Sequence, residues 1–289
     1  MKLLVLGANG QLGSDLLRVH GASPKKCEIV PLTRKEIDIS NSSSIAKLHH
    51  MTFDVLINCA SYNRVDDAED HAEEAFRINA SAVGELATVC QKKNARLLHV
   101  STDYVFDGRH KEPYVESDAT GPMNVYGASK LKGETVAFSA CRDVTVLRVA
   151  SLFGVAGSSG KGGNFVETMI RVGKEKGKLT VVNDSFMSPT STFDVAKIIF
   201  ALLERGAEPG IYHTVNSGEA SWYDFACEIL RRARVHADVI PVPSSEYPTR
   251  ARRPLWSVLR NEKIVQIVGP IPHWTEALDH YLREKGHIT

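Results

Sequence analysis

Short runs of aliphatic residues recur through the first half of the chain and alternate with longer stretches of mixed apolar and polar residues. The runs cover residues 3–6, 29–32, 55–58, 97–100 and 144–149. Strands that are apolar at successive positions are typical of a parallel sheet covered on both faces, and the stretches between them, such as 67–93, predict the covering helices. The pattern therefore predicts an α/β fold with a doubly wound parallel sheet of the Rossmann type.

The pattern changes after residue 150. A stretch rich in Gly and Ser over 154–163 predicts a loop, which we expect to lie over a substrate site. Beyond it, helices and strands are predicted over 165–177, 179–182, 192–204, 211–214 and 221–234. We expect two domains, a dinucleotide-binding domain over 1–150 to which 178–210 returns, and a smaller α/β substrate-binding domain made of 151–177 and 211–289.

The composition is that of an ordinary globular protein and argues against two classes of partner. The chain has 289 residues, of which 43% are hydrophobic, and this is ample for a large core. Lys and Arg total 35 against 34 Asp and Glu, so no excess of charge favours nucleic acid or an anionic membrane. No segment approaches the length that spans a bilayer. We therefore expect neither a nucleic-acid partner nor a membrane.

The cysteines and the N-terminus indicate a compartment. Five cysteines are scattered along the chain without a Cys-x-x-Cys pair, which disfavours a disulfide framework and a zinc site. The apolar residues before Gly7 are few and lack a small-residue cleavage region, so they predict a buried first strand and not a signal peptide. These features favour the reducing cytoplasm.

A glycine-rich turn follows the first predicted strand. Gly7, Gly10 and Gly13 allow a tight turn, close approach of a phosphate to the backbone, and close packing of the next helix on the sheet. The N-terminus of that helix then faces a dinucleotide pyrophosphate. Ligands of such sheets lie beyond the carboxyl ends of the strands, where the Gly7 turn, the segment after Asn58 and Thr102 all fall. The alternative is a simple glycine-rich turn.

The end of the second predicted strand bears on the choice between NADP and NAD. An acidic residue there accepts from the ribose hydroxyls of NAD, whereas a basic one pairs with the additional phosphate of NADP. The chain has Arg34 and Lys35 at this place, so we expect NADPH, with NADH kept as the alternative if the two cations are merely solvated. Asp38 and Ile39 follow and are expected to reach the adenine, although Asp38 also suits a helix cap.

Tyr126 and Lys130 are placed for proton transfer. One helical turn separates them, so both lie on one face, where the ammonium is expected to lower the phenol pKa and to hold the nicotinamide ribose. Tyr126 then serves as the general acid. Thr102, at the end of the fourth predicted strand, is expected to hydrogen-bond the same carbonyl oxygen and to fix it for hydride attack. This arrangement predicts a reductase.

Less specific patterns suggest roles for several other polar and aromatic residues. Asp103 suits a substrate contact, with a turn cap as its alternative. Arg250, Arg252 and Arg253 lie beside prolines, where guanidinium groups suit a diphosphate or form a solvated basic loop. We expect structural roles for three further residues, namely Asn79 as a satisfied buried amide, His213 at a strand end and Trp222 in the core.

At this point the sequence resembles the extended short-chain dehydrogenase/reductases and, within them, the dTDP-4-dehydrorhamnose reductase family. The likeness runs nearly the whole length and rests on the ordered segments 10–13, 38–40, 58–66, 101–108, 124–130, 164–166, 188–190, 221–223 and 251–254. It implies that Tyr126, Lys130 and Thr102 are catalytic. It further implies cofactor contacts from Gly10, Gln11, Leu12, Asp38, Ile39, Ser61, Tyr62 and Asn63, and sugar contacts from Thr102, Asp103 and Val65.

Two departures from the family bear on the sugar and on assembly. The family usually has a tryptophan over the sugar where this chain has Ser151, so we expect either a different sugar or another aromatic that compensates. Some bacterial members pair subunits through magnesium held by glutamates. Asp15 occupies one such place, but the segment 191–193 offers no acid at the second. We therefore expect no metal and no metal-bridged dimer, while a homodimer of another kind stays open.

The function implied is NADPH-dependent reduction of the 4-keto group of a nucleotide-activated deoxysugar, dTDP-4-dehydro-L-rhamnose to dTDP-L-rhamnose. A dehydratase of the same superfamily commonly has Asp-Glu after the threonine, whereas Thr102 is followed here by Asp103 and Tyr104. Two alternatives stay open. One is a sugar-nucleotide epimerase, and the other is a non-catalytic NADP-binding regulatory subunit similar to the β subunit of methionine adenosyltransferase.

Overall fold

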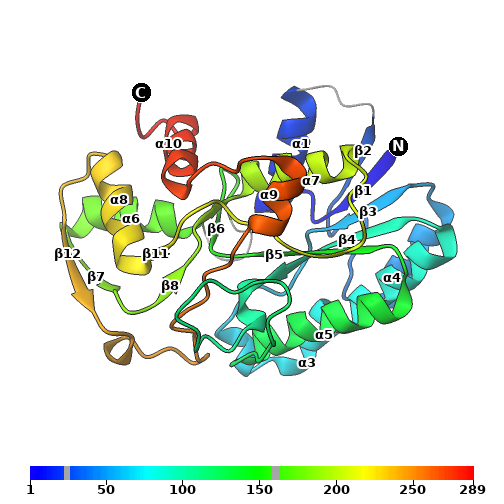
Figure 1. The fold of residues 1–289 in the computed structure, drawn as a ribbon, viewed down its shortest axis with the longest axis horizontal. Helices are drawn as coiled ribbons and strands as arrows, with labels where there is room; N and C mark the ends of the chain where they lie inside the picture. The colour runs from blue at the N-terminus through cyan, green and yellow to red at the C-terminus, as the bar shows by residue number, and fades with distance from the viewer. Residues whose placement is uncertain (23–26, 158–162) are drawn as a thin grey trace.

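Six parallel strands form the central sheet of the computed structural model, which describes residues 1–22, 27–157 and 163–289. They lie in the order β10-β5-β4-β3-β1-β2, and each neighbouring pair is parallel (Figure 1). The strands are β1 (Lys2–Leu6), β2 (Glu28–Leu32), β3 (Val55–Asn58), β4 (Arg96–Thr102), β5 (Val144–Val149) and β10 (Gly210–His213). The predicted doubly wound parallel sheet is confirmed.

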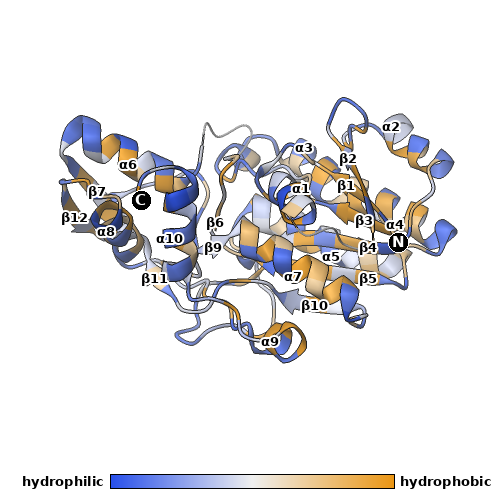
Figure 2. Ribbon diagram, turned by 90° about the horizontal axis from the view of Figure 1, so that it is seen from above, coloured by the Kyte–Doolittle hydropathy of each residue, from blue (hydrophilic) through white to orange (hydrophobic). Residues whose placement is uncertain are grey.

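Helices cover both faces of this sheet. Successive side chains of a strand point to opposite faces, so Leu3 and Val5 pack with α1 (Gln11–Ala22) and α7 (Thr192–Glu204). Leu4 and Leu6 pack with helices on the other face, α4 (Ala82–Lys93) and α5 (Val125–Ala140). In Figure 2 the central strands are mainly hydrophobic and the hydrophilic residues gather on the outer helix surfaces.

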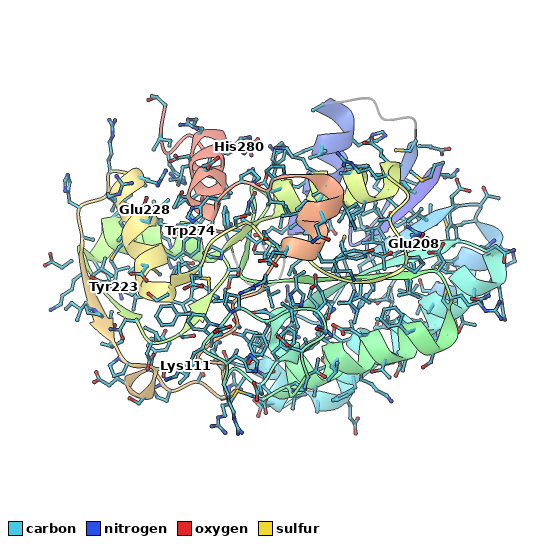
Figure 3. The ribbon with its side chains drawn as sticks, in the orientation of Figure 1. Lys111, Glu208, Tyr223, Glu228, Trp274 and His280 are labelled. Atoms are coloured by element: carbon cyan, nitrogen blue, oxygen red, sulfur yellow. The ribbon has the colours of Figure 1, made fainter. Side chains whose placement is uncertain are left out.

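A smaller α/β part lies beside the sheet. Its helices α6 (Phe165–Lys176), α8 (Trp222–Arg232) and α10 (Trp274–Glu284) enclose an apolar cluster of their own (Figure 1). Trp274, labelled in Figure 3, packs edge to face against Phe225 of α8 with ring centroids 5.6 Å apart. Two small sheets complete this part, β7 (Lys178–Val182) parallel to β12 (Asp238–Val242) and β8 (Phe186–Met187) antiparallel to β11 (Ala220–Ser221).

Two strands belong to a different part of the molecule from the one to which we assigned them. β7 belongs to the small sheet and not to the returning segment 178–210, because its Leu179 and Val181 pack into the cluster of the smaller part. β10 is an edge strand of the large sheet, in parallel register with β5, although we assigned 211–214 to the smaller domain. The helix α7 packs against the large sheet. The division of the chain into two domains stays a prediction.

The single helix expected over 67–93 is interrupted. A 3-10 turn (Asp67–Glu69) and α3 (Ala72–Phe76) precede a π-helical turn (Arg77–Ser81), and α4 follows. The wider π turn places the Asn79 amide where it accepts from the Tyr62 N–H at 2.9 Å and donates to the Ser129 hydroxyl at 2.9 Å. The prediction of a satisfied buried amide is therefore confirmed.

The remaining elements are short. They are α2 (Ser42–Ala46), α9 (Glu262–Val268), β6 (Leu152–Phe153) paired with β9 (Thr190–Ser191), and 3-10 turns at Lys47–His50, Asp103–Val105 and Ser244–Glu246. Within the predicted loop over 154–163, residues 158–162 lie outside the described residues. None of the helices in the described part of the chain combines the length and the apolar character that crossing a membrane requires.

Candidate active site

One cleft of about 700 Å³ is lined by most of the residues that we predicted to act on cofactor or substrate, but not by Lys35, Arg250 or Arg252. It lies at the carboxyl ends of β1, β3 and β4 and extends to the smaller part of the molecule. The predicted residues that line it are Gly7, Gly10, Gln11, Leu12, Arg34, Asp38, Ile39, Ser61, Tyr62, Asn63, Val65, Thr102, Asp103, Tyr126, Lys130, Ser151 and Arg253. The topology thus gathers into one place residues from seven separate stretches of sequence.

The glycine turn between β1 and α1 forms one end of the cleft. Gly7 has a φ of +72°, and the Gly10 N–H donates to its carbonyl oxygen at 2.9 Å. A Cβ on Gly13 would lie 2.3 Å from that same oxygen, so only glycine allows α1 to pack this closely. Gly10 differs, since a Cβ there would meet only the Gly7 oxygen within 4 Å. The turn therefore exposes backbone amides at the N-terminus of α1.

A salt bridge occupies the end of the cleft beyond β2. The Arg34 guanidinium contacts the Asp38 carboxylate at 3.0 Å, and 75% of the Arg34 side chain is exposed. Partial burial works to raise the pKa of Asp38, but hydrogen bonds from Ser40 and Arg34 outweigh it and lower that pKa. One oxygen of Asp38 also accepts from the Ser40 N–H at 2.9 Å. A cation and an anion are thus both present where a ribose would lie.

The first turn of α5 brings Tyr126 to Thr102. Asn124 caps the helix by accepting from the Gly127 N–H at 2.8 Å. A Cβ on Gly127 would lie 2.2 Å from the Tyr104 carbonyl oxygen, so glycine permits the close approach of α5 to the end of β4. The side chains of Tyr126 and Thr102 are hydrogen-bonded. Both side chains line the cleft, and their action on one carbonyl oxygen stays a prediction.

Asp103 extends this hydrogen-bonded group. Its carboxylate accepts from the Thr102 hydroxyl at 2.9 Å, and the residue is only 3% exposed. Burial raises the pKa of Asp103 to about 6, against the lowering effect of hydrogen bonds from Ser257 and Thr102. The Thr102 hydroxyl also accepts from the Tyr104 N–H, at 3.2 Å, and so caps the turn that follows.

Replacing Asp103 with Asn is expected to stabilise the protein at neutral pH by about 1–3 kcal/mol. The unfolded carboxyl titrates near about 3.9 and the folded one higher, so the folded protein binds the extra proton and loses stability as the pH rises between these values. Urea unfolding of wild type and variant at neutral pH and at about pH 4 measures the difference, which should nearly vanish in acid. The exposed Asp238→Asn serves as the control, and an equal pH dependence for both variants contradicts the prediction.

Lys130 is oriented differently from the prediction. We expected its ammonium to lower the pKa of Tyr126, but the Lys130 amine donates to the Val100 carbonyl oxygen at 2.6 Å. Burial raises the pKa of Tyr126, and the Thr102 hydrogen bond opposes this only in part. Burial also lowers the pKa of Lys130 to about 8, against the effect of Glu134. Desolvation, which sequence spacing does not reveal, therefore dominates both groups.

Ion pairs join the loop that carries the three predicted arginines to the 3-10 turn at Asp67–Glu69 and its two flanking residues. The Arg253 guanidinium contacts Asp66 at 2.7 Å and lines the cleft, with 40% of its side chain exposed. Arg250 pairs instead with Asp67 and Asp70, and its side chain is not among those that line the cleft. Of the arginines that we predicted to suit a diphosphate, Arg253 therefore lines the cleft and Arg250 does not.

Two aromatic side chains that the sequence did not single out line the same cleft as Ser151. Phe165 and Trp222 pack edge to face with ring centroids 4.7 Å apart, and both line the cleft. The expectation that Trp222 belongs to the core is incomplete, because it is half-buried and contacts the apolar cluster while one side faces the cleft. Ser151 itself has a φ of +43°, a conformation that turns the chain into β6. The sequence left open that another aromatic compensates for the tryptophan, but it did not identify these two rings.

Asp15 has partners of its own. Its buried carboxylate accepts from the Thr192 hydroxyl and contacts the Arg18 guanidinium at 2.5 Å. Burial raises the pKa of Asp15, and the contacts to Thr192 and Arg18 oppose this. Among the residues that the structure describes, no three His, Cys, Asp or Glu side chains gather as metal ligands do.

Comparisons with the sequences of known proteins agree on one family. The family model described as "RmlD substrate binding domain" matches residues 1–286. A dTDP-4-dehydrorhamnose reductase of Burkholderia thailandensis is 36% identical over 98% of this chain and 99% of its own length. A dTDP-4-keto-6-deoxy-D-glucose reductase of Streptomyces niveus is 37% identical over 95% of this chain and 94% of its own length. The chain is therefore similar to reductases of two sugar nucleotides.

Solved structures agree with these relatives. The dTDP-4-dehydrorhamnose reductase of Bacillus anthracis, solved in complex with NADP, superposes with a TM-score of 0.91 at 35% identity. The likeness covers 98% of this chain and 99% of that one. The correspondence extends over both the large sheet and the smaller part of the molecule.

Proposed function

Because this chain belongs to the RmlD substrate binding domain family, we propose that it is an NADPH-dependent oxidoreductase that reduces the 4-keto group of a nucleotide-activated deoxysugar. The observation that carries the proposal is the convergence of the glycine turn, Thr102, Tyr126 and Lys130 on one cleft. The specific substrate that we propose is dTDP-4-dehydro-L-rhamnose, reduced to dTDP-L-rhamnose. The free cysteines and the use of NADPH favour the cytoplasm as its location.

The cleft fits a nicotinamide dinucleotide. The N-terminus of α1 and Gly10, where a Cβ would meet only the Gly7 oxygen within 4 Å, suit the pyrophosphate, and Arg34 and Asp38 suit the adenosine half. Gln11, Leu12, Ile39, Ser61, Tyr62 and Asn63 would complete the contacts, as the family implies. When bound, NADPH supplies the hydride.

The residues at the end of β4 and the start of α5 would handle the proton. Thr102 turns its hydroxyl hydrogen from Asp103 to the carbonyl oxygen of the substrate, and Tyr126 gives its proton to that oxygen as the alcohol forms. The raised pKa of Tyr126 keeps the phenol protonated before the reaction. Lys130 turns from the Val100 carbonyl toward the cleft, where its positive charge stabilises the tyrosinate that proton transfer leaves behind.

The sugar and its diphosphate would lie between Asp103 and the smaller part. Asp103, Val65 and Ser151 border the place for the deoxysugar, and Phe165 and Trp222 supply an aromatic surface in the absence of a tryptophan at 151. Arg253 would exchange its contact with Asp66 for the diphosphate. The buried carboxylate of Asp15 keeps Arg18 and Thr192 as partners, so we propose no metal-bridged dimer through Asp15.

Replacing Arg34 with Ala is expected to raise the KM for NADPH about tenfold, the effect of losing roughly one charge-assisted hydrogen bond. The KM for NADH should change by less than about twofold, since NADH lacks the phosphate that Arg34 contacts. Steady-state kinetics with both cofactors measures the difference. Lys35→Ala is the matched control, because Lys35 is adjacent and exposed but does not line the cleft. Equal changes for both cofactors would exclude the assigned contact.

Replacing Arg253 with Gln is expected to raise the KM for the sugar nucleotide about tenfold and to change kcat little, since the diphosphate is remote from the reacting carbon. Arg250→Gln is the control, because its ion pairs to Asp67 and Asp70 lie outside the cleft lining. It should leave KM within about twofold. A change of kcat alone in Arg253→Gln would contradict a diphosphate contact.

A turnover assay with the purified chain tests the proposed function. The chain should oxidise NADPH only when dTDP-4-dehydro-L-rhamnose is present and should yield one sugar alcohol for each NADP formed. A protein that binds NADPH but oxidises none with any 4-keto sugar nucleotide would instead be a regulatory NADP-binding subunit. Release of an epimeric ketone without net oxidation of NADPH would indicate an epimerase.

A further inference from the structure

His99 is a buried histidine that lies against Lys130 and does not itself line the cleft. It belongs to β4 and is 0% exposed, and its Nε2 is 3.4 Å from the Lys130 amine. Its other ring nitrogen, Nδ1, is 3.2 Å from the side-chain nitrogen of Asn58, at the end of the neighbouring strand β3. Asn58 is also 0% exposed and does not line the cleft.

The backbone fixes which of these atoms donate. The Ala60 N–H donates to the Asn58 side-chain oxygen at 3.1 Å. Since a backbone N–H can only donate, the Asn58 amide must present its NH2 group to His99. The Nδ1 of His99 then accepts from Asn58. A neutral imidazole with an accepting Nδ1 carries its proton on Nε2, the nitrogen that faces Lys130.

His99 also stays neutral. Burial lowers its pKa well below the usual range, and the nearby Lys130 charge lowers it further. The ring therefore offers an N–H, and never a lone pair, to the Lys130 amine in this arrangement. An ammonium group has only donors, so it meets the His99 N–H unfavourably, whereas a neutral amine accepts from it.

We propose that His99 is a positioning residue that disfavours the charged form of Lys130 while that side chain lies against β4, so that the ammonium is favoured where Lys130 turns to the cleft. The hydrogen bond to the Val100 carbonyl is compatible with either form of Lys130, so it does not set the charge. His99 does. This inference rests on the proposed role of Lys130 in the reaction, although the hydrogen-bond order itself depends only on Ala60, Asn58 and His99.

The other ionisable groups that face Lys130 do not reverse this argument. Glu134, one turn further along α5, favours the ammonium but is itself paired with Arg148 at 2.7 Å. Cys59 follows β3, and burial raises the pKa of its thiol to about 12, so it is uncharged. Tyr126 precedes Lys130 on α5, and burial raises its pKa as well. His99 is thus the neutral group whose hydrogen-bond direction decides the contact.

The tautomer of His99 can be observed directly by long-range ¹H–¹⁵N NMR on the protein without ligands. We expect the Nε2–H tautomer, unchanged as the pH passes through the usual histidine value of about 6.5. His213 provides an internal control, because its Nδ1 lies 3.1 and 3.2 Å from the carbonyl oxygens of Tyr114 and Arg260 and must donate. His213 should therefore show the opposite tautomer in the same spectrum. An Nδ1–H tautomer or a protonated ring for His99 would overturn the proposal.

Two variants of Asn58 test the effect on Lys130. Asn58→Leu removes the donor that fixes the ring, and Asn58→Asp offers an acceptor that reverses the tautomer. Both should let His99 accept from the ammonium and raise the pKa of Lys130 by about one unit. The pKa is followed by NMR of ¹³C-labelled lysine, with Lys130→Met used to assign the resonance.

The outcomes separate hydrogen-bond direction from added charge. A rise in both variants supports the proposal, and a rise in Asn58→Asp alone attributes it to the new carboxylate and overturns the proposal. If Asn58→Leu does not fold, a wild-type Nε2–H tautomer that becomes Nδ1–H in Asn58→Asp supports it, and an unchanged tautomer contradicts it. None of these measurements uses substrate or NADPH, so they can succeed even if the proposed reductase activity fails.

Discussion

Replacing Tyr126 with Phe should lower kcat by about a hundredfold to ten-thousandfold, which is the usual contribution of a positioned general acid. The variant loses the only phenol that is hydrogen-bonded to Thr102 among the described residues, while the ring and its packing against Tyr104 are kept. The KM for NADPH should change little, because the lost oxygen acts on the substrate carbonyl. Steady-state kinetics with saturating NADPH measures both quantities.

Tyr104 supplies the matched control for this prediction. Its ring lies 5.9 Å from that of Tyr126, and it lines the same cleft, but its hydroxyl is hydrogen-bonded to Arg253. Tyr104→Phe should therefore affect the substrate KM more than kcat. Comparable losses of kcat in the two variants would show that Tyr126 has no special role in proton transfer.

Replacing Glu134 with Leu should lower the free energy of unfolding by about 3–5 kcal/mol, the usual cost of leaving one member of a buried ion pair without its partner. Glu134 of α5 and Arg148 of β5 form a buried ion pair, with side chains only 4% and 3% exposed. The Ser101 hydroxyl also donates to Glu134 at 2.5 Å. Without the carboxylate, the Arg148 charge stays buried beside the Phe106 ring, 5.0 Å away. Urea unfolding measures the loss.

Two comparisons distinguish the buried charge from simple loss of a side chain. The double variant Glu134→Leu with Arg148→Met should be more stable than the single variant, because no unpaired charge is left. Glu175→Ala breaks an exposed pair with Arg171, whose side chains are 54% and 60% exposed, and should cost less than about 1 kcal/mol. Equal destabilisation by the single and double variants would mean that the buried Arg148 charge is not the cause.

The features that the sequence predicted correctly depend on local pattern. The continuous apolar runs predicted all five of the first strands, because a strand buried on both faces needs apolar residues at every position. Gly7, Gly10 and Gly13 predicted one end of the cleft, since their backbone geometry is fixed within a single turn. Tyr126 and Thr102 both line the cleft, because a helix start and a strand end meet at the same edge of the sheet, and their roles in the reaction stay predictions.

The features that were missed depend on tertiary contacts. β7 and β10 have similar apolar patterns, and only their pairing partners, β12 and β5, decide which sheet each one joins. The orientation of Lys130 is set by burial and by the Val100 carbonyl, neither of which the Tyr126 to Lys130 spacing contains. Trp222 faces both the apolar cluster and the cleft, a double role that helix periodicity cannot reveal. These features depend on contacts between segments that are far apart in the sequence, and local pattern does not contain those contacts.

The fate of a deuteride carried by NADPH at its transferable position tests the central claim most directly. The chain should convert dTDP-4-dehydro-L-rhamnose into dTDP-L-rhamnose with one deuterium at C4 for each NADPH consumed, as read by mass spectrometry and NMR of the product. The same reaction with dTDP-4-keto-6-deoxy-D-glucose should be slower. Unlabelled product, or labelled product only from the second sugar, would contradict the proposed reaction or its proposed substrate, respectively.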